Sequence, residues 1–232
     1  MTHPPVGPLR DHAGTAKFRH QAVAVVLRVT EQLEVLTHTR QREPFPGLPE
    51  LPSGPVEVDE SLDQSVIRHL RNLLNRSADA AKVAHFEQLV TRGEVGRDPF
   101  DRTIATAYLG LTPQAHEGQW LPVAGLREMA FDHLELVELA VARLRGKLSY
   151  TNIAFALMPE AFSLAQLSEV YCAVLGYEVS VTNLKRVLSR RGVLEPTGDV
   201  VKPAGGGRPA ALYRFASQRL VVTDPFAAFR PS

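Results

Sequence analysis

The residues best suited to chemistry lie on one predicted helix, from Val181 to Arg191. At 100° per residue, its apolar and polar side chains fall on opposite faces. The inward members are Val181, Leu184, Val187 and Leu188, and the outward members are Thr182, Asn183, Lys185, Arg186, Ser189 and Arg190. Arginine can grip guanine edges, asparagine can read adenine, and small hydroxyls reach bases or phosphates. The outward face therefore suits the major groove of DNA, although a plain solvated helix has the same pattern.

A glycine-tipped hairpin after this helix carries two more candidate DNA contacts, Lys202 and Arg208, beside Gly205–Gly207. Such a finger suits phosphates or the minor groove, and its alternative is an ordinary surface hairpin. Further upstream, Arg145 and Lys147 lie near the end of another predicted helix. They either touch backbone phosphates or complement the helix dipole. The predicted DNA-binding set is Thr182, Asn183, Lys185, Arg186, Ser189, Arg190, Lys202, Arg208 and Lys147.

A second pattern, Gly-x5-Glu-x7-Arg, spans residues 54–68. It resembles the start of the Nudix box, in which later glutamates on the same helix hold divalent cations at a pyrophosphate. Carboxylates suit this role because Mg²⁺ prefers hard oxygen ligands. Here His69, Asn72 and Leu73 occupy those later positions. We therefore expect no metal site, no cofactor and no enzyme activity. The alternative is a pyrophosphatase that recruits other carboxylates near the loop, such as Glu57, Asp59, Glu60 and Asp63.

The 232 residues include 26 basic and 25 acidic side chains, a net charge of +1 that argues against a nucleic-acid partner. The charge is unevenly divided, however. Residues 140–232 hold 12 basic and 6 acidic residues, net +6, and residues 1–139 hold 14 and 19, net −5. Such asymmetry favours a nucleic-acid-binding second half.

Composition also limits the class of protein. A single cysteine, Cys172, excludes an intrachain disulfide and a cysteine-rich metal site. The longest apolar run, 22–27, is too short to span a membrane, and residues 1–10 lack a signal peptide's apolar stretch. We expect a cytoplasmic protein with no membrane partner.

The elements that must position these residues form two groups along the chain. The first group reads as strands at 21–29, 33–37 and 102–111, a Pro/Gly-rich loop at 44–54, a helix at 61–74 with Ser61 as N-cap, and a short strand or turn at 120–123. No element is predicted in the polar stretch before residue 102. A helix then runs from Asp132, its expected N-cap, to Gly146, and we expect His133 to play a structural role.

The second group has the order of a winged helix-turn-helix. A capping box at Ser163 opens a helix that stops at Gly176, and Ser180 caps the helix that stops at Gly192. Strand-like segments follow at 193–197 and 211–215. The predicted domains are residues 15–128, a linker helix at 129–148, and a winged-helix domain at 149–232.

Four segments together resemble the NrtR family, Nudix-related transcriptional regulators of NAD metabolism. They are residues 97–103, residues 120–123 with 130–133, residues 144–157, and residues 206–215. The resemblance covers roughly residues 18–215. It implies an α/β (α+β) fold, with an N-terminal Nudix-like α/β/α sandwich and a C-terminal winged helix-turn-helix. It also implies a homodimeric repressor of NAD biosynthesis or salvage genes that binds a palindromic operator and senses ADP-ribose or a related NAD-derived nucleotide.

A pocket for ADP-ribose needs cations for two phosphates and a surface on which adenine can stack. The candidate effector-binding residues are Arg40, Arg42, Arg68 and Arg102 as cations, and Phe45 and Tyr108 as stacking rings. The arginines have an alternative role in ion pairs with neighbours such as Glu43 or Asp101. A protein that binds DNA constitutively and keeps only a vestigial pocket is a third interpretation.

Overall fold

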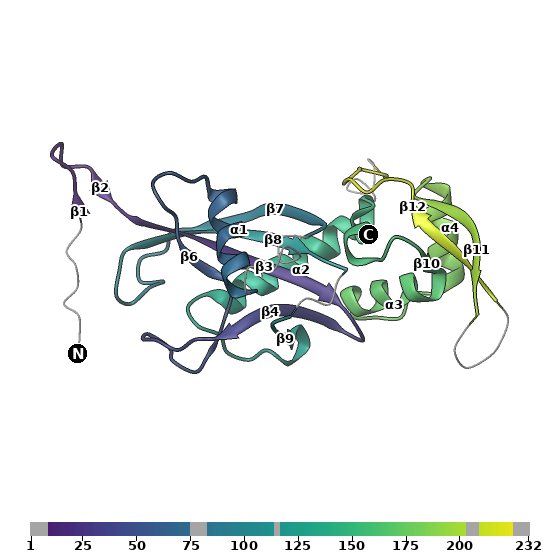
Figure 1. The fold of residues 1–232 in the computed structure, drawn as a ribbon, viewed down its shortest axis with the longest axis horizontal. Coiled ribbons are helices and arrows are strands. Elements are labelled where there is room, and N and C mark those ends of the chain that lie inside the picture. The colour runs from purple at the N-terminus through teal and green to yellow at the C-terminus, as the bar shows by residue number, and fades with distance from the viewer. Residues whose placement is uncertain (1–8, 75–82, 114–116, 203–208, 225–232) are drawn as a thin grey trace, which may run out of the picture.

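The computed structural model describes residues 9–74, 83–113, 117–202 and 209–224. Figure 1 shows a sheet unit at one end of the molecule and a smaller unit of helices and a hairpin at the other. The helix α2 (His133–Tyr150) runs between the two units. A small hairpin of β1 (Leu9–Arg10) and β2 (Ala16–Lys17) projects from the far end of the sheet unit. Among these residues, no helix is long and apolar enough to cross a membrane.

The sheet has seven strands in the described part of the chain, with the order β5-β4-β3-β8-β7 along its main path. The central strands β3 and β8 are parallel, and both β4 on β3 and β7 on β8 are antiparallel. β6 pairs with β3, and β9 pairs with β4. The strands are β3 (Arg19–Val29), β4 (Leu33–Thr39), β5 (Pro49–Glu50), β6 (Ser53–Pro55), β7 (His85–Arg92), β8 (Thr103–Leu111) and β9 (Gln119–Pro122).

The apolar run in β3 is buried on both faces, as expected for a central strand. Val23, Val25 and Leu27 join the apolar cluster that includes α2. Ala22 and Val26 join a second cluster beneath α1 (Leu62–Leu73). The sheet is therefore covered by a helix on each face, and the predicted α/β/α sandwich is confirmed.

The strand β7 was missed in the sequence because its pattern is irregular. Within β7 only Leu89 is buried, so the strand lacks a clear apolar alternation. Its pairing with β8 also shifts register between Gln88 and Val90. A bulge of this kind moves the following side chains to the other face and breaks the period of two.

The helix α2 corrects two predictions. It continues through Gly146 to Tyr150, because Leu148 is buried in the core and Thr151 hydrogen-bonds the Lys147 carbonyl at the C-cap. Asp132 holds the N-cap position but makes no side-chain cap hydrogen bond. Its carboxylate pairs instead with a distant arginine, described below.

The smaller unit has the expected winged-helix order. Its elements are η3 (Ile153–Leu157), β10 (Phe162–Ser163), α3 (Leu164–Leu175), α4 (Val181–Arg190), β11 (Leu194–Val201) and β12 (Ala210–Phe215). The capping box at Ser163 is confirmed, and α3 ends at Gly176 with φ of 82°, a conformation that favours glycine. Ser180 precedes α4, but its side chain makes no cap hydrogen bond.

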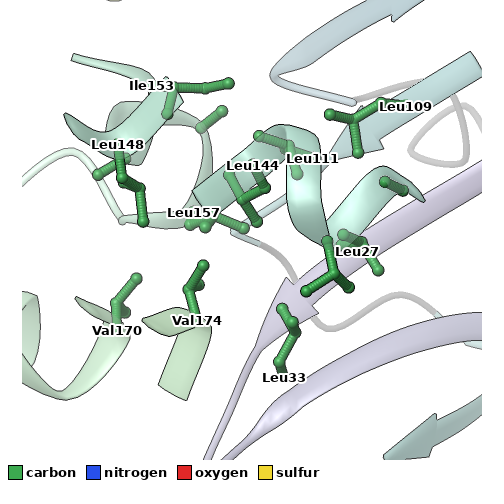
Figure 2. Close-up of a cluster of buried hydrophobic side chains, with 14 of the residues drawn as sticks. Leu27, Leu33, Leu109, Leu111, Leu144, Leu148, Ile153, Leu157, Val170 and Val174 are labelled. Carbon is green, nitrogen blue, oxygen red and sulfur yellow. The ribbon is translucent and has the colours of Figure 1, made fainter. Parts of the chain in front are cut away.

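One apolar cluster runs from the sheet into the winged-helix unit. Figure 2 shows Leu27 and Leu111 of the sheet, Leu144 of α2, and Val170 and Val174 of α3 within this cluster. The described parts of the two units therefore share a core that is built around α2.

Candidate functional site

A pocket of about 140 Å³ lies where the start of β3 meets the segments around β5 and β6. Its remaining walls come from the loop after β4, the loop at 98–101, and Phe131, two residues before α2. The lining residues are Arg19, Gln21, Arg40, Arg42, Glu43, Pro44, Glu50, Ser53, Gly54, Pro55, Asp98, Phe100, Asp101 and Phe131. Two of the six predicted effector residues, Arg40 and Arg42, are among them.

Arg40 is part of the pocket wall and is already fully engaged. Its guanidinium donates to Glu50 Oε1 at 2.8 Å, to the Glu43 carbonyl at 3.0 Å and to the Pro44 carbonyl. It also lies 4.7 Å from the centre of the Phe131 ring. Only 4% of Arg40 is exposed. Arg40 therefore holds the loop that frames the pocket.

Glu50 is the buried counter-charge of this wall. Burial raises its pKa, but hydrogen bonds from His38 and Arg40 outweigh that effect and lower the pKa to about 2. The His38 Nε2 lies 3.4 Å from Glu50 Oε2. The carboxylate is therefore ionised at neutral pH and unavailable as an acid.

The exposed cations of the pocket are Arg42 and Arg19. Arg42 makes no hydrogen bond or ion pair within the described residues, whereas the Arg19 guanidinium lies 3.9 Å from Asp101. Phe100, which also lines the pocket, is 49% exposed. The arrangement offers cationic groups and an aromatic face to a ligand that carries both anionic and flat apolar parts.

Arg68, another predicted effector residue, is held beside the pocket. Its Nη2 donates to the Pro55 carbonyl at 2.9 Å and to Glu60 Oε1 at 2.5 Å, and its Nε donates to Glu60 Oε2 at 2.9 Å. This bidentate pair lowers the pKa of Glu60 to about 2. The surviving members of the Gly-x5-Glu-x7-Arg pattern therefore bind one another and fix the loop before α1.

The first residue of that pattern, Gly54, has a steric role. A β-carbon at Gly54 would lie 2.2 Å from Cε1 of the His69 ring, which is hydrogen-bonded to the Pro55 carbonyl. We expect Gly54→Ala to lower the free energy of unfolding by about 1–3 kcal/mol, as overpacking does. His69→Ala in the same chain should restore most of it. Urea denaturation of the two single variants and the double variant measures this, and additive losses would contradict the contact.

The other three predicted effector residues lie outside the pocket lining. Phe45 packs edge-on against Phe131, at 5.3 Å between ring centres. Arg102 lies over Phe18, and Tyr108 stacks on Phe86 at 5.0 Å on the α1 face of the sheet. The sequence does not show which face of the sheet Tyr108 occupies, because successive β8 side chains point to opposite faces and both faces are buried.

Arg97 connects the pocket to α2, and sequence reasoning gave it no role. Its side chain, 2% exposed, pairs with Asp132 at the start of α2 and lies 3.4 Å from Gln21 Oε1. The loop that follows Arg97 supplies the pocket residues Asp98, Phe100 and Asp101. The only sign of its importance in the sequence was that Arg97 begins one of the four segments that resemble the NrtR family, residues 97–103.

His133, at the start of α2, has the structural role that the sequence predicts. Its Nδ1 accepts a hydrogen bond from the Leu51 amide at 3.1 Å, and the residue is 1% exposed. Burial lowers its pKa from 6.5 to about 4, so the folded protein keeps the ring neutral.

We expect stability to fall as the pH drops from about 6.5 to 4, because the unfolded chain binds a proton there and the folded chain does not. The full shift corresponds to about 3 kcal/mol. Urea unfolding across this range measures the loss. His133→Gln should give a flatter dependence, and equal slopes in both proteins would contradict the assignment.

The helix α1 carries no carboxylate at the positions where the Nudix box has its later glutamates, and the residues there are His69, Asn72 and Leu73. His69 is turned toward Gly54, Asn72 is exposed, and Leu73 is partly buried. Across the described ranges, no group of three or more His, Cys, Asp or Glu residues is placed to hold a metal ion.

The second candidate site is the outward face of α4. Thr182, Asn183, Lys185, Arg186, Ser189 and Arg190 are all exposed, whereas Leu184 and Leu188 are buried. Val181 departs from the predicted inward set, at 41% exposed. Arg186 donates to Asn183 Oδ1 at 2.7 Å, and the Lys185 Nζ lies 5.7 Å from the Tyr213 ring. Several donors are thus presented together on one helix face.

The remaining predicted DNA contacts are distributed differently. Lys202 is exposed at the end of β11, and Arg208 lies outside the described residues. Lys147 is a correction, because its Nζ lies 2.7 Å from Glu87 Oε2 and its side chain is 14% exposed. It ties α2 to β7 and does not belong to the α4 surface.

Together, the fold and the two sites define a Nudix-like sheet domain joined to a winged-helix DNA-binding domain. A family model for the NrtR DNA-binding winged helix domain matches residues 154–215. The ADPR responsive transcriptional repressor NtrR of Acinetobacter baylyi is 31% identical over 198 residues, which cover 81% of this chain and 77% of that protein. The chain belongs to the NrtR family.

Two solved structures are similar to this chain, one over most of its length and one over the sheet domain. Shewanella oneidensis NrtR complexed with a 27mer DNA matches with a TM-score of 0.72 and 30% identity, over 90% of this chain and 95% of that one. The NUDIX domain of that protein complexed with ADP ribose matches with a TM-score of 0.50 and 31% identity, over 58% of this chain and 93% of that one.

Proposed function

We propose that this protein is a DNA-binding transcriptional repressor of NAD biosynthesis or salvage genes. The observation that carries the proposal is the exposed polar and cationic face of α4, within a segment that matches the NrtR winged helix. Two relatives support it, a transcriptional repressor and an NrtR complexed with DNA. In this proposal Thr182, Asn183, Lys185, Arg186, Ser189 and Arg190 contact DNA, with Lys202 and Arg208 in the wing.

We further infer that the pocket on the sheet binds ADP-ribose or a related NAD-derived nucleotide. The name of the Acinetobacter relative and the ADP-ribose complex of the Shewanella domain support this effector. Arg42 and Arg19 face the phosphates, and Phe100 offers a ring to the base. Arg40 and Arg68 position the surrounding loops through Glu50 and Glu60.

The domain has no hydrolase role in this proposal. Both oxygens of Glu60 are occupied by Arg68, and His69, Asn72 and Leu73 offer no carboxylate along α1. Mg²⁺ held at a pyrophosphate needs such oxygen ligands. An assay for Mg²⁺-dependent cleavage of ADP-ribose should show no turnover above the buffer rate. Turnover abolished in Glu60→Gln would establish the pyrophosphatase instead.

The organisation follows the same proposal. A sensor domain at 15–128, the linker helix at 129–148 and a DNA-binding domain at 149–232 form a cytoplasmic homodimer on a palindromic operator. Two-fold symmetry places the two α4 helices in half-sites about one DNA turn apart.

The route between the sites is a short chain of contacts. Phe131 and the loop after Arg97 line the pocket, and Arg97 holds Asp132 at the start of α2. At the other end of α2, the Ser149 carbonyl accepts a hydrogen bond from Arg191 at the end of α4. A nucleotide that binds more tightly to one arrangement of the pocket, α2 and α4 than to another would shift the fraction of molecules that can bind DNA.

The test is operator binding titrated with nucleotide. Duplex DNA selected by the protein from a random library is bound at fixed salt, and ADP-ribose, NAD and AMP are then added. We expect ADP-ribose to change the operator affinity and AMP to have a weaker effect. An operator affinity that no nucleotide changes would overturn the sensor role, and the absence of any selected sequence would overturn the repressor role.

A further inference from the structure

After β12 the chain returns to the end of α2 as a strap, residues 217–224. Val222 of the strap forms an antiparallel bridge with Thr151, the C-cap residue of α2. The next residue, Asn152, is 3% exposed and binds the strap with its side chain. Its Nδ2 donates to two strap carbonyls at 3.0 and 3.1 Å, and its Oδ1 accepts from one strap amide at 2.7 Å. The strap is therefore held on the end of α2 by specific polar contacts.

The strap and α4 supply partners to the last carbonyl groups of α2. A helix leaves its last four carbonyls without partners inside the helix. The Tyr150 carbonyl accepts from the strap amides of Thr223 and Asp224, at 2.8 and 3.1 Å. The Ser149 carbonyl accepts from Arg191 Nη2 at 2.6 Å. Two elements outside α2 thus complete its C-terminal end.

Arg191 joins all three elements through one guanidinium. It is the C-cap residue of α4, and its Nη2 lies 3.3 Å from Asp224 Oδ2 of the strap as well as close to the Ser149 carbonyl. The side chains of Arg191 and Asp224 are 12% and 11% exposed. An ion pair this enclosed is screened by salt less than a surface pair. A cation is also favoured at the C-terminal end of a helix such as α2.

This contact differs in kind from the apolar packing beneath α4. Leu184 and Leu188 are buried, and apolar burial has little directional preference. A hydrogen bond depends strongly on distance and angle, so the Arg191 contacts fix a direction. Arg191 also follows directly on Arg190, one of the residues proposed to contact DNA. The orientation of α4 relative to α2 therefore depends on Arg191 and on the strap that holds it.

We propose that Arg191 and Asp224 are positioning residues that lock α4 to the end of α2, so that a movement of α2 on nucleotide binding is passed to the DNA-contacting face. This inference rests on the proposed repressor function and names the contact that transmits its signal. Neither residue lines the nucleotide pocket, and neither belongs to the outward face of α4. Both act through other residues.

The experiment measures operator affinity of the full chain by fluorescence anisotropy at fixed salt, with and without saturating ADP-ribose. The ratio of the two affinities is the coupling, which is commonly about 5–150-fold. In Arg191→Ala the coupling should fall below about twofold, because α4 no longer follows α2. Calorimetry without DNA should show the same ADP-ribose affinity as in the unchanged protein.

The matched control is Arg219→Ala, which removes an arginine from the strap itself. Arg219 is exposed and is held by Asn152 through its main-chain carbonyl, so the strap keeps this contact in the variant. Its coupling should equal that of the unchanged protein. Arg191→Lys, which keeps a charged donor, should retain most of the coupling.

The coupling separates positioning from a merely structural role. A strap that only stabilises the unit would change both operator affinities by the same factor and would lower the melting temperature. An unchanged coupling in Arg191→Ala would therefore overturn the inference. Asp224→Ala keeps the bond from Arg191 to Ser149 and should lose part of the coupling. It carries the same test if Arg191→Ala does not fold.

The two proposals fail in different ways. If ADP-ribose leaves the operator affinity of the unchanged protein as it is, the sensor role is overturned and this inference falls with it. If the unchanged protein responds and the Arg191 and Asp224 variants respond equally, only this inference is overturned.

Discussion

Replacing Arg186 and Arg190 together with alanine should weaken specific operator binding by about 100-fold at fixed salt. Both side chains are exposed on α4, and each arginine that reaches a guanine edge contributes about 1–3 kcal/mol of discrimination. Neither side chain is needed for the core, because Leu184 and Leu188 form the buried face of the helix. The melting temperature should therefore stay close to that of the unchanged protein.

The matched control for this variant removes two arginines outside the winged-helix unit. Arg127 is exposed in the segment before α2, and Arg143 of α2 pairs with Glu87 of β7. Their replacement by alanine changes the net charge equally but leaves α4 intact. Titrations at several salt concentrations separate non-specific attraction from sequence readout. Equal operator affinity in the two double variants would refute the assignment of α4.

The second large effect concerns two neighbouring arginines with different roles. Arg40→Ala should lower the free energy of unfolding by about 3–5 kcal/mol, because it leaves the buried Glu50 carboxylate without its main partner. Arg42→Ala should change stability by less than about 0.5 kcal/mol, since the side chain is exposed. It should instead weaken ADP-ribose by about tenfold, the usual effect of losing a charge-assisted hydrogen bond.

Urea denaturation and nucleotide calorimetry on both variants measure this contrast. Arg40→Ala/Glu50→Gln should recover part of the lost stability, because no unpaired charge is then buried. A stable Arg40→Ala protein with impaired nucleotide binding would reverse the two roles.

The elements of this fold were predictable wherever a local pattern carries the information. The helix at 61–74 was predicted from Ser61 as N-cap and from apolar residues at helical spacing, and the structure adds Gln64 as the second member of a capping box. The helix at 163–176 was predicted from its capping box, Ser163 with Gln166. The sequence prediction ended the helix before its true end, at Gly146, although the helix runs on to Tyr150. A glycine ends a helix only where the chain also turns away from the helix axis. Here the buried Leu148 keeps the next turn in the core.

The site residues were harder to predict, because their roles depend on partners that are distant in sequence. The sequence does not distinguish the roles of Arg40, Arg42 and Arg68. Only the folded chain shows that Arg40 pairs with Glu50 and that Arg68 pairs with Glu60. The ion pair of Lys147 with Glu87 was not foreseen, because Glu87 lies on β7, a strand whose sequence pattern is too irregular to predict. The face of α4 was predictable because helical spacing alone separates its buried and exposed sides.

The unbroken course of α2 has a mechanical consequence. Its 18 residues span about 27 Å, so a tilt of about 5° at the Asp132 end displaces the Tyr150 end by about 2 Å. Hydrogen bonds to base edges weaken steeply over such distances. A rigid lever of this length turns a small adjustment of the pocket wall into a change that a DNA groove can detect. In a dimer the two displacements would change the separation of the two α4 helices, which must match the spacing of the DNA half-sites.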